Sequence, residues 1–218
     1  MFRTRLIVIF AFLQMVSFAT AQDTIFVPCW SGKNSEIFGP KKVKGAVISS
    51  ATGKRAYVLV SANTPSRGAC SNVTQLFVSG RTGEFHKVFE AQPTKTDDGT
   101  DDGNGMRLIG WNRSGTRLMA ELGRFSYGTD TGMSRKIIIY DDASDRVSHV
   151  DIESALSKHF GEDCAFDFET QAWIEPDSAA VQVREYRDVL DDTVKSCVQR
   201  PTQLVVNLST GATSPMPN

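Results

Sequence analysis

The sequence has few histidines and lacks two motifs that mark common enzyme and metal sites. It contains neither the Gly-x-Ser-x-Gly motif that positions the nucleophile of many serine hydrolases nor the Cys-x-x-Cys spacing of structural zinc sites. The nearest approach to the hydrolase motif is Ser126, which has Arg124 where the motif requires glycine. The histidines are His86, His149 and His159. Serine hydrolase and zinc chemistry are therefore poorly supported.

The sequence also lacks an excess of positive charge. The chain has 24 lysines and arginines against 25 aspartates and glutamates, which gives a formal charge of −1 at pH 7. Domains that bind nucleic acid usually carry a clustered basic surface. The single basic run, Lys41-Lys42-Val43-Lys44, is more typical of a solvated edge strand, where lysines discourage pairing with other chains. We therefore expect no nucleic-acid partner.

Long apolar runs are absent except near the N-terminus. There, Arg3 and Arg5 precede the apolar run Leu6–Val16, and Ala19-Thr20-Ala21 follows in the small-x-small pattern of a cleavage site. The run is shorter than the ~20 residues that a membrane-spanning helix needs. We predict a signal peptide over residues 1–21 and a single domain over 22–218, secreted or periplasmic, with no membrane span after cleavage. An uncleaved N-terminal anchor is the alternative.

The most informative pattern in the sequence is a threefold repeat over residues 45–89, 107–152 and 171–216. Each unit has a strand-like run, a turn, a second run, a long polar loop, and a third run with a turn at its far end. The period exceeds the ~40–50 residues of common propeller blades, and the extra residues lie in the central loop. Small sheets of this kind bury their faces only by stacking on one another. The repeat therefore predicts an all-β fold of antiparallel sheets.

One segment departs from the β pattern. Asp151 is a favourable helix N-cap, apolar residues follow at helical spacing through Phe160, and Gly161 is suited to end the helix. We expect one short helix between the second and third units. His86 and His149 occupy similar points in the last strands of the first two units, so the repeat explains them without a catalytic role.

Two tryptophans accompany the repeat. Trp111 and Trp173 are expected to open equivalent strands and to pack between adjacent sheets. The segment that follows Trp111, Asn112-Arg113-Ser114-Gly115-Thr116-Arg117-Leu118, resembles the turn W-S-P-D-G-K-x-I of TolB-like, WD40-like (PD40-type) β-propeller repeats. Glu175-Pro176-Asp177-Ser178 is similar to the same turn, and Thr52-Gly53-Lys54 is a weaker copy. The resemblance implies three propeller-like units of three to four strands each.

Three units are fewer than the about 4–8 blades of most propellers, and they leave two sheet edges to be closed or covered. A homodimer would close a ring of six sheets. A fourth blade would need residues 22–44 together with other segments. A β-sandwich or an open stack of sheets would form no ring. The resemblance also implies that a strand at Thr24–Val27 completes the last blade. The sequence leaves these arrangements open.

The four cysteines indicate two disulfides, because an even number in an exported chain usually forms a disulfide framework. Cys70 and Cys197 lie at the same place in the central loops of the first and third units, and Cys29 and Cys164 precede those units. Of the three connectivities, this symmetry favours Cys29–Cys70 and Cys164–Cys197.

The acidic loop 97–104 is the candidate metal site. Asp98, Thr100 and Asp102 stand at alternate positions before Gly103 and match the start of an EF-hand-like calcium loop, but Ile109 stands where the closing glutamate belongs. Asn104 adds a further oxygen donor. The candidate ligands for calcium are Asp97, Asp98, Asp101 and Asp102. The alternative is a solvated linker.

The central loops 61–73, 123–134 and 186–201 follow equivalent strands and should lie on one side of the molecule, where binding residues commonly gather. Arg124, Phe125 and Tyr127 have the arginine and aromatic character of binding hot spots. The resemblance implies a periplasmic interaction module or an accessory domain of a peptidase. We expect a non-catalytic module that binds a protein or envelope partner, with no cofactor other than calcium. A small secreted hydrolase or metal-dependent enzyme that uses the loop 97–104 is the alternative.

Overall fold

The computed structural model describes residues 23–25, 41–62, 72–80, 82–93, 102–126, 134–186 and 196–217. The predicted signal peptide, the aspartates 97, 98 and 101, Tyr127, Cys29 and Cys70 lie outside these ranges. For Asp102 and Phe125 only the backbone is described.

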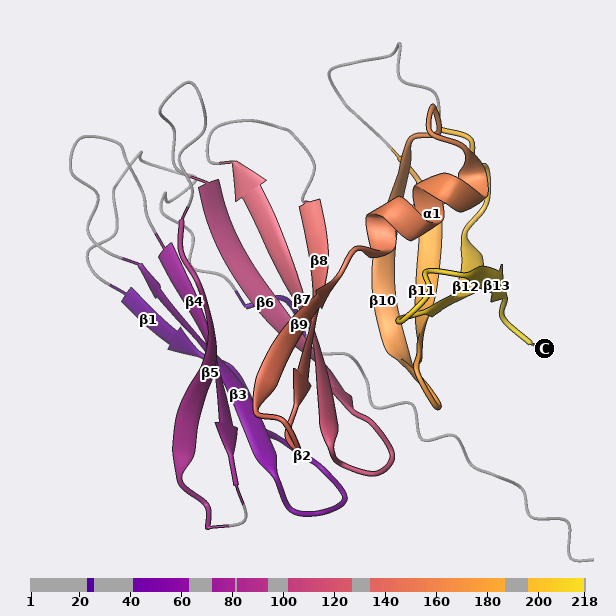
Figure 1. Ribbon diagram of the computed structural model, residues 1–218. Coiled ribbons are helices and arrows are strands. Elements are labelled where there is room, and N and C mark those ends of the chain that lie inside the picture. The colour runs from indigo at the N-terminus through magenta and orange to yellow at the C-terminus, as the bar shows by residue number, and fades with distance from the viewer. Residues whose placement is uncertain are drawn as a thin grey trace, which may run out of the picture.

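The described residues form three antiparallel sheets, which confirms the all-β prediction (Figure 1). The first sheet has the order β1-β3-β4-β5, with β2 also paired to β3. Its strands are β1 (Lys41–Lys44), β2 (Ile48–Ser49), β3 (Arg55–Ala62), β4 (Asn72–Ser79) and β5 (Phe85–Ala91). The lysine-rich run is therefore an edge strand, as its composition predicts.

The second and third sheets are four-stranded meanders in chain order. The second contains β6 (Asp102–Trp111), β7 (Arg117–Ser126), β8 (Ser134–Asp141) and β9 (Arg146–Val150). The third contains β10 (Phe166–Ile174), β11 (Ser178–Glu185), β12 (Thr202–Asn207) and β13 (Thr213–Pro215). Each sheet corresponds to one repeat unit, because each unit's turns and central loop join neighbouring strands.

The helix α1 (Ile152–Phe160) lies between the second and third sheets in the chain, where the sequence predicts it. The Asp151 carboxylate accepts a hydrogen bond of 2.9 Å from the Ser154 backbone N–H. Gly161 ends the helix with φ of 101° and donates its N–H to the Ser157 carbonyl. Residues 152–160 are the only described α-helix, and no helix in the described ranges is long and apolar enough to cross a membrane.

Two apolar cores hold the stack together, with the second sheet between the other two (Figure 1). Residues in β7 alternate between them, as period-two side chains in a strand must. Leu118, Ala120 and Leu122 join the core shared with the first sheet, whereas Met119 joins the core shared with the third sheet and α1. The middle sheet is thus buried on both faces.

The two tryptophans pack between sheets as predicted, but they do not open strands. Trp111 is the last residue of β6 and packs against the first core. Trp173 lies near the end of β10, packs against the second core, and donates from Nε1 to the Gly110 carbonyl at 2.8 Å. The strand begins before Trp111 because Met106 and Leu108 are buried core residues despite the glycines around them, and before Trp173 because Phe168 is buried in the second core.

Two turns that the repeat aligns, at residues 50–54 and 112–117, share their hydrogen bonding. In the second sheet, Asn112 Oδ1 accepts from the backbone N–H groups of Thr116 and Arg117, both at 2.9 Å. In the first sheet, Ser50 Oγ plays the same part by accepting from the Lys54 N–H at 3.0 Å. Short polar side chains stabilise turns by such local bonds. The turn at residues 50–54 and the turn after Trp111 are therefore stabilised by the same kind of side-chain contact.

Thr24 and Ile25, the described residues of the predicted N-terminal strand, do not complete the last sheet. Ile25 instead exchanges backbone hydrogen bonds of 3.0 and 3.1 Å with Met106 on the free edge of β6, in the second sheet. Its side chain packs against the first core. Within the described residues, 23–25 and 41–44 form no separate sheet, because β1 joins the first sheet. Of the residues 22–44 that a fourth blade would need, the described ones thus pair with the first and second sheets, and the fourth blade stays a prediction.

Polar contacts join neighbouring sheets at both ends of the stack. At the end of the central loops, the Asn104 N–H donates to Asn72 Oδ1 at 2.9 Å, and Arg135 Nε lies 3.7 Å from Asp167 Oδ1. At the opposite end, Lys54 pairs with Asp142. The strand ends that lead into the central loops consequently lie on one side of the molecule, as the repeat predicts.

Candidate functional site

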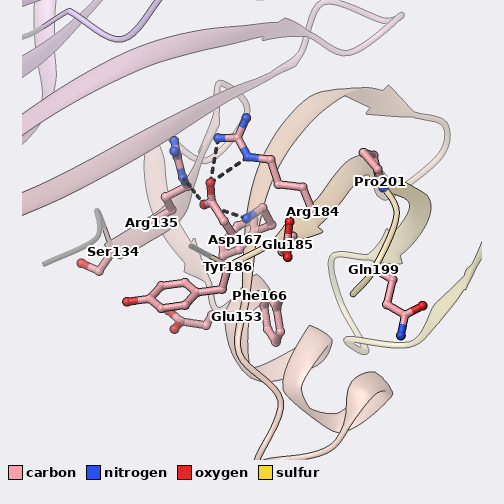
Figure 2. Close-up of a pocket in the computed structure, with 11 residues that line it drawn as sticks. Ser134, Arg135, Glu153, Phe166, Asp167, Arg184, Glu185, Tyr186, Gln199 and Pro201 are labelled. Atoms are coloured by element: carbon pink, nitrogen blue, oxygen red, sulfur yellow. Dashed lines mark hydrogen bonds and ion pairs between the residues drawn. The ribbon is translucent and has the colours of Figure 1, made fainter. Parts of the chain in front are cut away.

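A cavity of about 690 Å³ opens where β10 begins and β11 ends (Figure 2). The first turn of α1, the start of β8 and the segment before β12 complete its wall. We call it the third-sheet cavity. The lining side chains used below are Arg135, Glu153, Phe166, Asp167, Arg184 and Tyr186.

Antiparallel pairing brings the charged residues of this cavity together. Asp167 in β10 lies directly opposite Arg184 in β11, and such cross-strand neighbours are within reach of one another. Arg184 Nε donates to Asp167 Oδ2 at 2.8 Å. That hydrogen bond, together with the charge of Asp167, raises the pKa of Arg184 above its ordinary value. Arg135 Nε lies 3.7 Å from the other oxygen of Asp167, so this carboxylate is held between two guanidinium groups.

A buried ion-pair cluster supports the cavity from behind. Glu121 is only 1 % exposed. It accepts from Arg107 Nε at 3.0 Å and Nη2 at 3.1 Å, from Arg135 Nη1 at 3.0 Å, and from the Thr170 backbone N–H at 3.1 Å. Burial alone would raise the pKa of Glu121, but the hydrogen bonds and charges of Arg107 and Arg135 outweigh it and hold that pKa below its ordinary value. Arg135 is therefore fixed from both sides.

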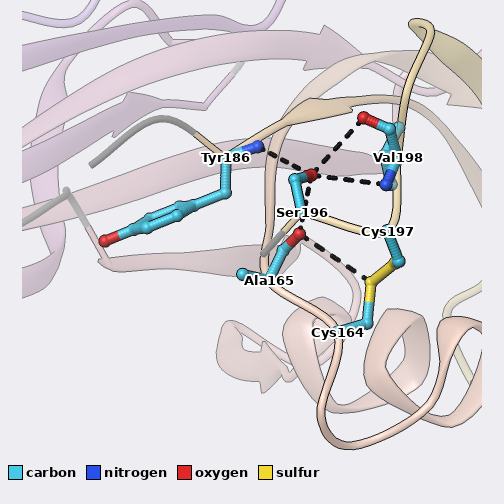
Figure 3. Close-up of a disulfide and its surroundings, with 6 residues drawn as sticks. All are labelled: Cys164, Ala165, Tyr186, Ser196, Cys197 and Val198. Atoms are coloured by element: carbon cyan, nitrogen blue, oxygen red, sulfur yellow. Dashed lines mark hydrogen bonds between the residues drawn. A yellow bond between two sulfur atoms is a disulfide. The ribbon is translucent and has the colours of Figure 1, made fainter. Parts of the chain in front are cut away.

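A disulfide holds the outer wall of the cavity in place (Figure 3). Cys164 and Cys197 are bonded, with their Cα atoms 5.4 Å apart. Next to the disulfide, Ser196 Oγ donates to the Ala165 carbonyl at 2.9 Å and accepts from the Tyr186 N–H at 3.1 Å. Gln199 and Pro201 of the cavity wall lie in the segment that these contacts join to the start of β10 and the end of β11.

The lining combines these paired charges with aromatic surface. Phe166 is half-buried, and its ring centroid lies 5.7 Å from that of Phe160 and 6.4 Å from that of Phe168. Ligand sites are usually apolar with a few fixed polar groups. The charged pair of Asp167 and Arg184 and the ring of Phe166 give the third-sheet cavity this kind of lining.

Arg124 is the one predicted partner-binding residue whose side chain the structure describes, and it lies outside the third-sheet cavity. Arg124 is half-buried and lines a second cavity of about 480 Å³ between the first and second sheets, together with Phe89, Lys136 and His149. The backbone of Phe125 lies in β7, opposite Gly103, and Tyr127 lies beyond the described residues. The three residues thus remain a prediction as a group.

The predicted metal loop is mostly outside the described ranges. β6 begins at Asp102, so Gly103 and Asn104 are strand residues and not part of a loop. Asn104 is 1 % exposed, and its side-chain amide donates to the Asn72 carbonyl at 3.1 Å. Within the described part of the chain, no group of three or more His, Cys, Asp or Glu side chains is arranged to hold a metal ion.

The remaining sequence predictions fall on the repeat itself. The Cys164–Cys197 pairing agrees with the symmetric connectivity, and Cys29–Cys70 stays a prediction. His86 lies in β5 and His149 in β9. His149 packs edge to face on Phe89, with centroids 5.7 Å apart.

Sequence reasoning missed Asp167 and Arg184, although a usable signal is present. In a hairpin between two strands of known register, an acidic and a basic residue at opposed positions indicate a cross-strand pair. The third-sheet cavity also needs β8, α1 and the Ser196–Pro201 segment, which only the folded chain brings together. No protein-family model, curated protein or solved structure matches this chain.

Proposed function

We propose that this chain is an exported, non-catalytic binding module whose third-sheet cavity holds a side chain or short segment of a protein partner. The observation that carries the proposal is the lining of the cavity, which has a volume of about 690 Å³ and is lined by Arg184, Phe166 and Tyr186. Arginine and tyrosine are enriched among the residues that contribute most to protein–protein binding. The ion pairs behind the cavity fix its shape before a partner arrives, which lowers the ordering cost of association.

Two further features support export and interaction. Residues 1–21 have the pattern of a signal peptide, and the Cys164–Cys197 disulfide is typical of oxidising compartments. The resemblance of the turns to TolB-like repeats supports a periplasmic or secreted interaction role. We also propose that two copies of the chain can close a ring of six sheets, and this does not depend on the cavity.

Site-directed photocrosslinking in cells that export the full chain tests the proposal. A photoreactive phenylalanine analogue at Gln199, in the cavity wall, should give a specific crosslinked partner band. The same analogue at Ala143, an exposed residue in the turn between β8 and β9, is the matched control and should give none. Arg184→Glu should abolish the Gln199 band. Equal crosslinking at both positions, or none at Gln199, would contradict the proposal.

A further inference from the structure

The first sheet has one face that no described sheet or helix covers. In β3, the residues Ala56, Val58 and Val60 are buried toward the second sheet, and Tyr57 and Leu59 between them point the other way and are half-buried. In the second and third sheets, the equivalent face is buried against the sheet that comes before it in the chain. Leu118, Ala120 and Leu122 of the second sheet pack on the first sheet. Ala179, Val181 and Val183 of the third sheet pack on the second sheet. The first sheet has the equivalent face, but no described sheet precedes it in the stack and covers that face.

That face carries a continuous aromatic patch. The rings of Tyr57 and Phe77 stack with centroids 5.0 Å apart and planes within 7°. Phe85 meets Tyr57 edge to face at 4.9 Å. The three rings come from β3, β4 and β5, so the patch runs across the sheet. Aromatic side chains of this kind dominate the energetics of many interfaces.

Positive charge surrounds the patch. Lys44 Nζ lies 4.0 Å from the centroid of the Tyr57 ring, and the Arg55 guanidinium carbon lies 5.1 Å from that of Phe85. Lys42 and Lys87 share the face, because they pair with Ser61 and Phe77. The one carboxylate among these strand residues, Glu90, is paired with Lys87. Four cations against one carboxylate give this face a net charge of +3, on a chain whose formal charge is −1.

We propose that this aromatic, basic face of the first sheet is a docking surface for an acidic protein segment with alternating apolar and carboxylate side chains. Apolar groups of such a segment would cover Tyr57, Phe77 and Phe85, and its carboxylates would pair with Lys44 and Arg55. Charge complementarity selects the occupant. A second copy bound through the same face would place the four cations of one chain against those of the other, and because like charges repel, a second copy is not the occupant we propose.

The edge of the sheet does not offer an equivalent site. β1 is four residues long and carries lysines, which discourages the addition of a further strand. Docking therefore involves the face of the sheet and not its hydrogen-bonding edge. This surface is separate from the third-sheet cavity, and the inference does not depend on the function proposed for that cavity.

Fluorescence anisotropy of the oxidised full chain with a labelled peptide of alternating leucine and glutamate tests the inference. We expect saturable binding that weakens with salt, and no binding of the matched leucine–lysine peptide. The double variant Lys44→Glu/Arg55→Glu should bind about tenfold more weakly. Arg146→Glu, an exposed charge reversal in β9, is the control and should bind like wild type.

Three results would overturn the inference. The first is unchanged peptide binding by the double variant when its melting temperature matches that of wild type. The second is binding of a thymidine oligonucleotide on the same face, which would make it a polyanion site. The third is a mass that rises with protein concentration together with loss of peptide binding, which would assign the face to contact between copies. Tyr57→Phe, which keeps the ring, should retain binding.

Discussion

The buried ion-pair cluster makes the stability of the stack unusually sensitive to one carboxylate. Glu121→Gln keeps the shape of the side chain but removes its charge and places an amide where an oxygen accepts from Arg107 and Thr170. Breaking a buried ion pair by changing one partner costs about 3–5 kcal/mol, because the other charge stays buried and unpaired. The Arg107 side chain is 4 % exposed, so water offers it little compensation. Glu169 retains one contact with Arg107, which favours the lower end of this range.

Thermal and guanidinium unfolding of the oxidised protein measure this loss. For a domain of this size each kcal/mol lowers the melting temperature by about 2–4 °C, so the expected fall is about 6–20 °C. Glu153→Gln, an exposed change in the first turn of α1, is the matched control and should change the free energy of unfolding by less than about 0.5 kcal/mol. The double variant Arg107→Met/Glu121→Leu should recover much of the loss. A Glu121→Gln protein within about 1 kcal/mol of wild type would refute the reasoning.

Three further predictions concern the same elements. The pKa of Glu121 is depressed in the folded state, so its contribution to the free energy of unfolding is fully present above the ordinary value of 4.5 and is lost as pH falls through the folded pKa. The difference in unfolding free energy between wild type and Glu121→Gln should therefore shrink below pH 4.5. A difference that stays constant with pH would contradict this. Replacing Cys164 and Cys197 by serine opens a loop with a sequence separation of 33 and should cost roughly 4 kcal/mol in guanidinium unfolding, with wild type under reducing conditions as the comparison. Asp151→Ala should cost about 1 kcal/mol through loss of the α1 cap, whereas Asp151→Asn should cost much less.

Local patterns in the sequence predict the elements of this fold well. Alternation such as that of Ala56, Val58 and Val60 follows from one sheet face being buried, and the Asp151 cap and Gly161 follow from backbone hydrogen bonding at helix ends. Such features depend only on residues close in the chain. Each repeat unit therefore corresponds to one sheet.

Relations between the sheets are less visible in the sequence. The contact between Arg107 and Thr170 joins residues 63 positions apart, and nothing in either local pattern specifies it. The glycines within β6 make this strand, which ends at Trp111, difficult to predict from the sequence, because glycine has low β propensity. The third-sheet cavity combines five segments, so no single motif predicts it.

The central claim is that the third-sheet cavity binds a protein partner, and the most direct measurement is calorimetric titration of the partner identified by crosslinking at Gln199. We predict that Arg184→Glu weakens its binding by at least about 2 kcal/mol, as expected for a hot-spot arginine, without lowering the melting temperature enough to unfold the protein. Lys158→Glu, in the last turn of α1, should bind as wild type does. Equal affinity of the wild-type and Arg184→Glu proteins would contradict the account.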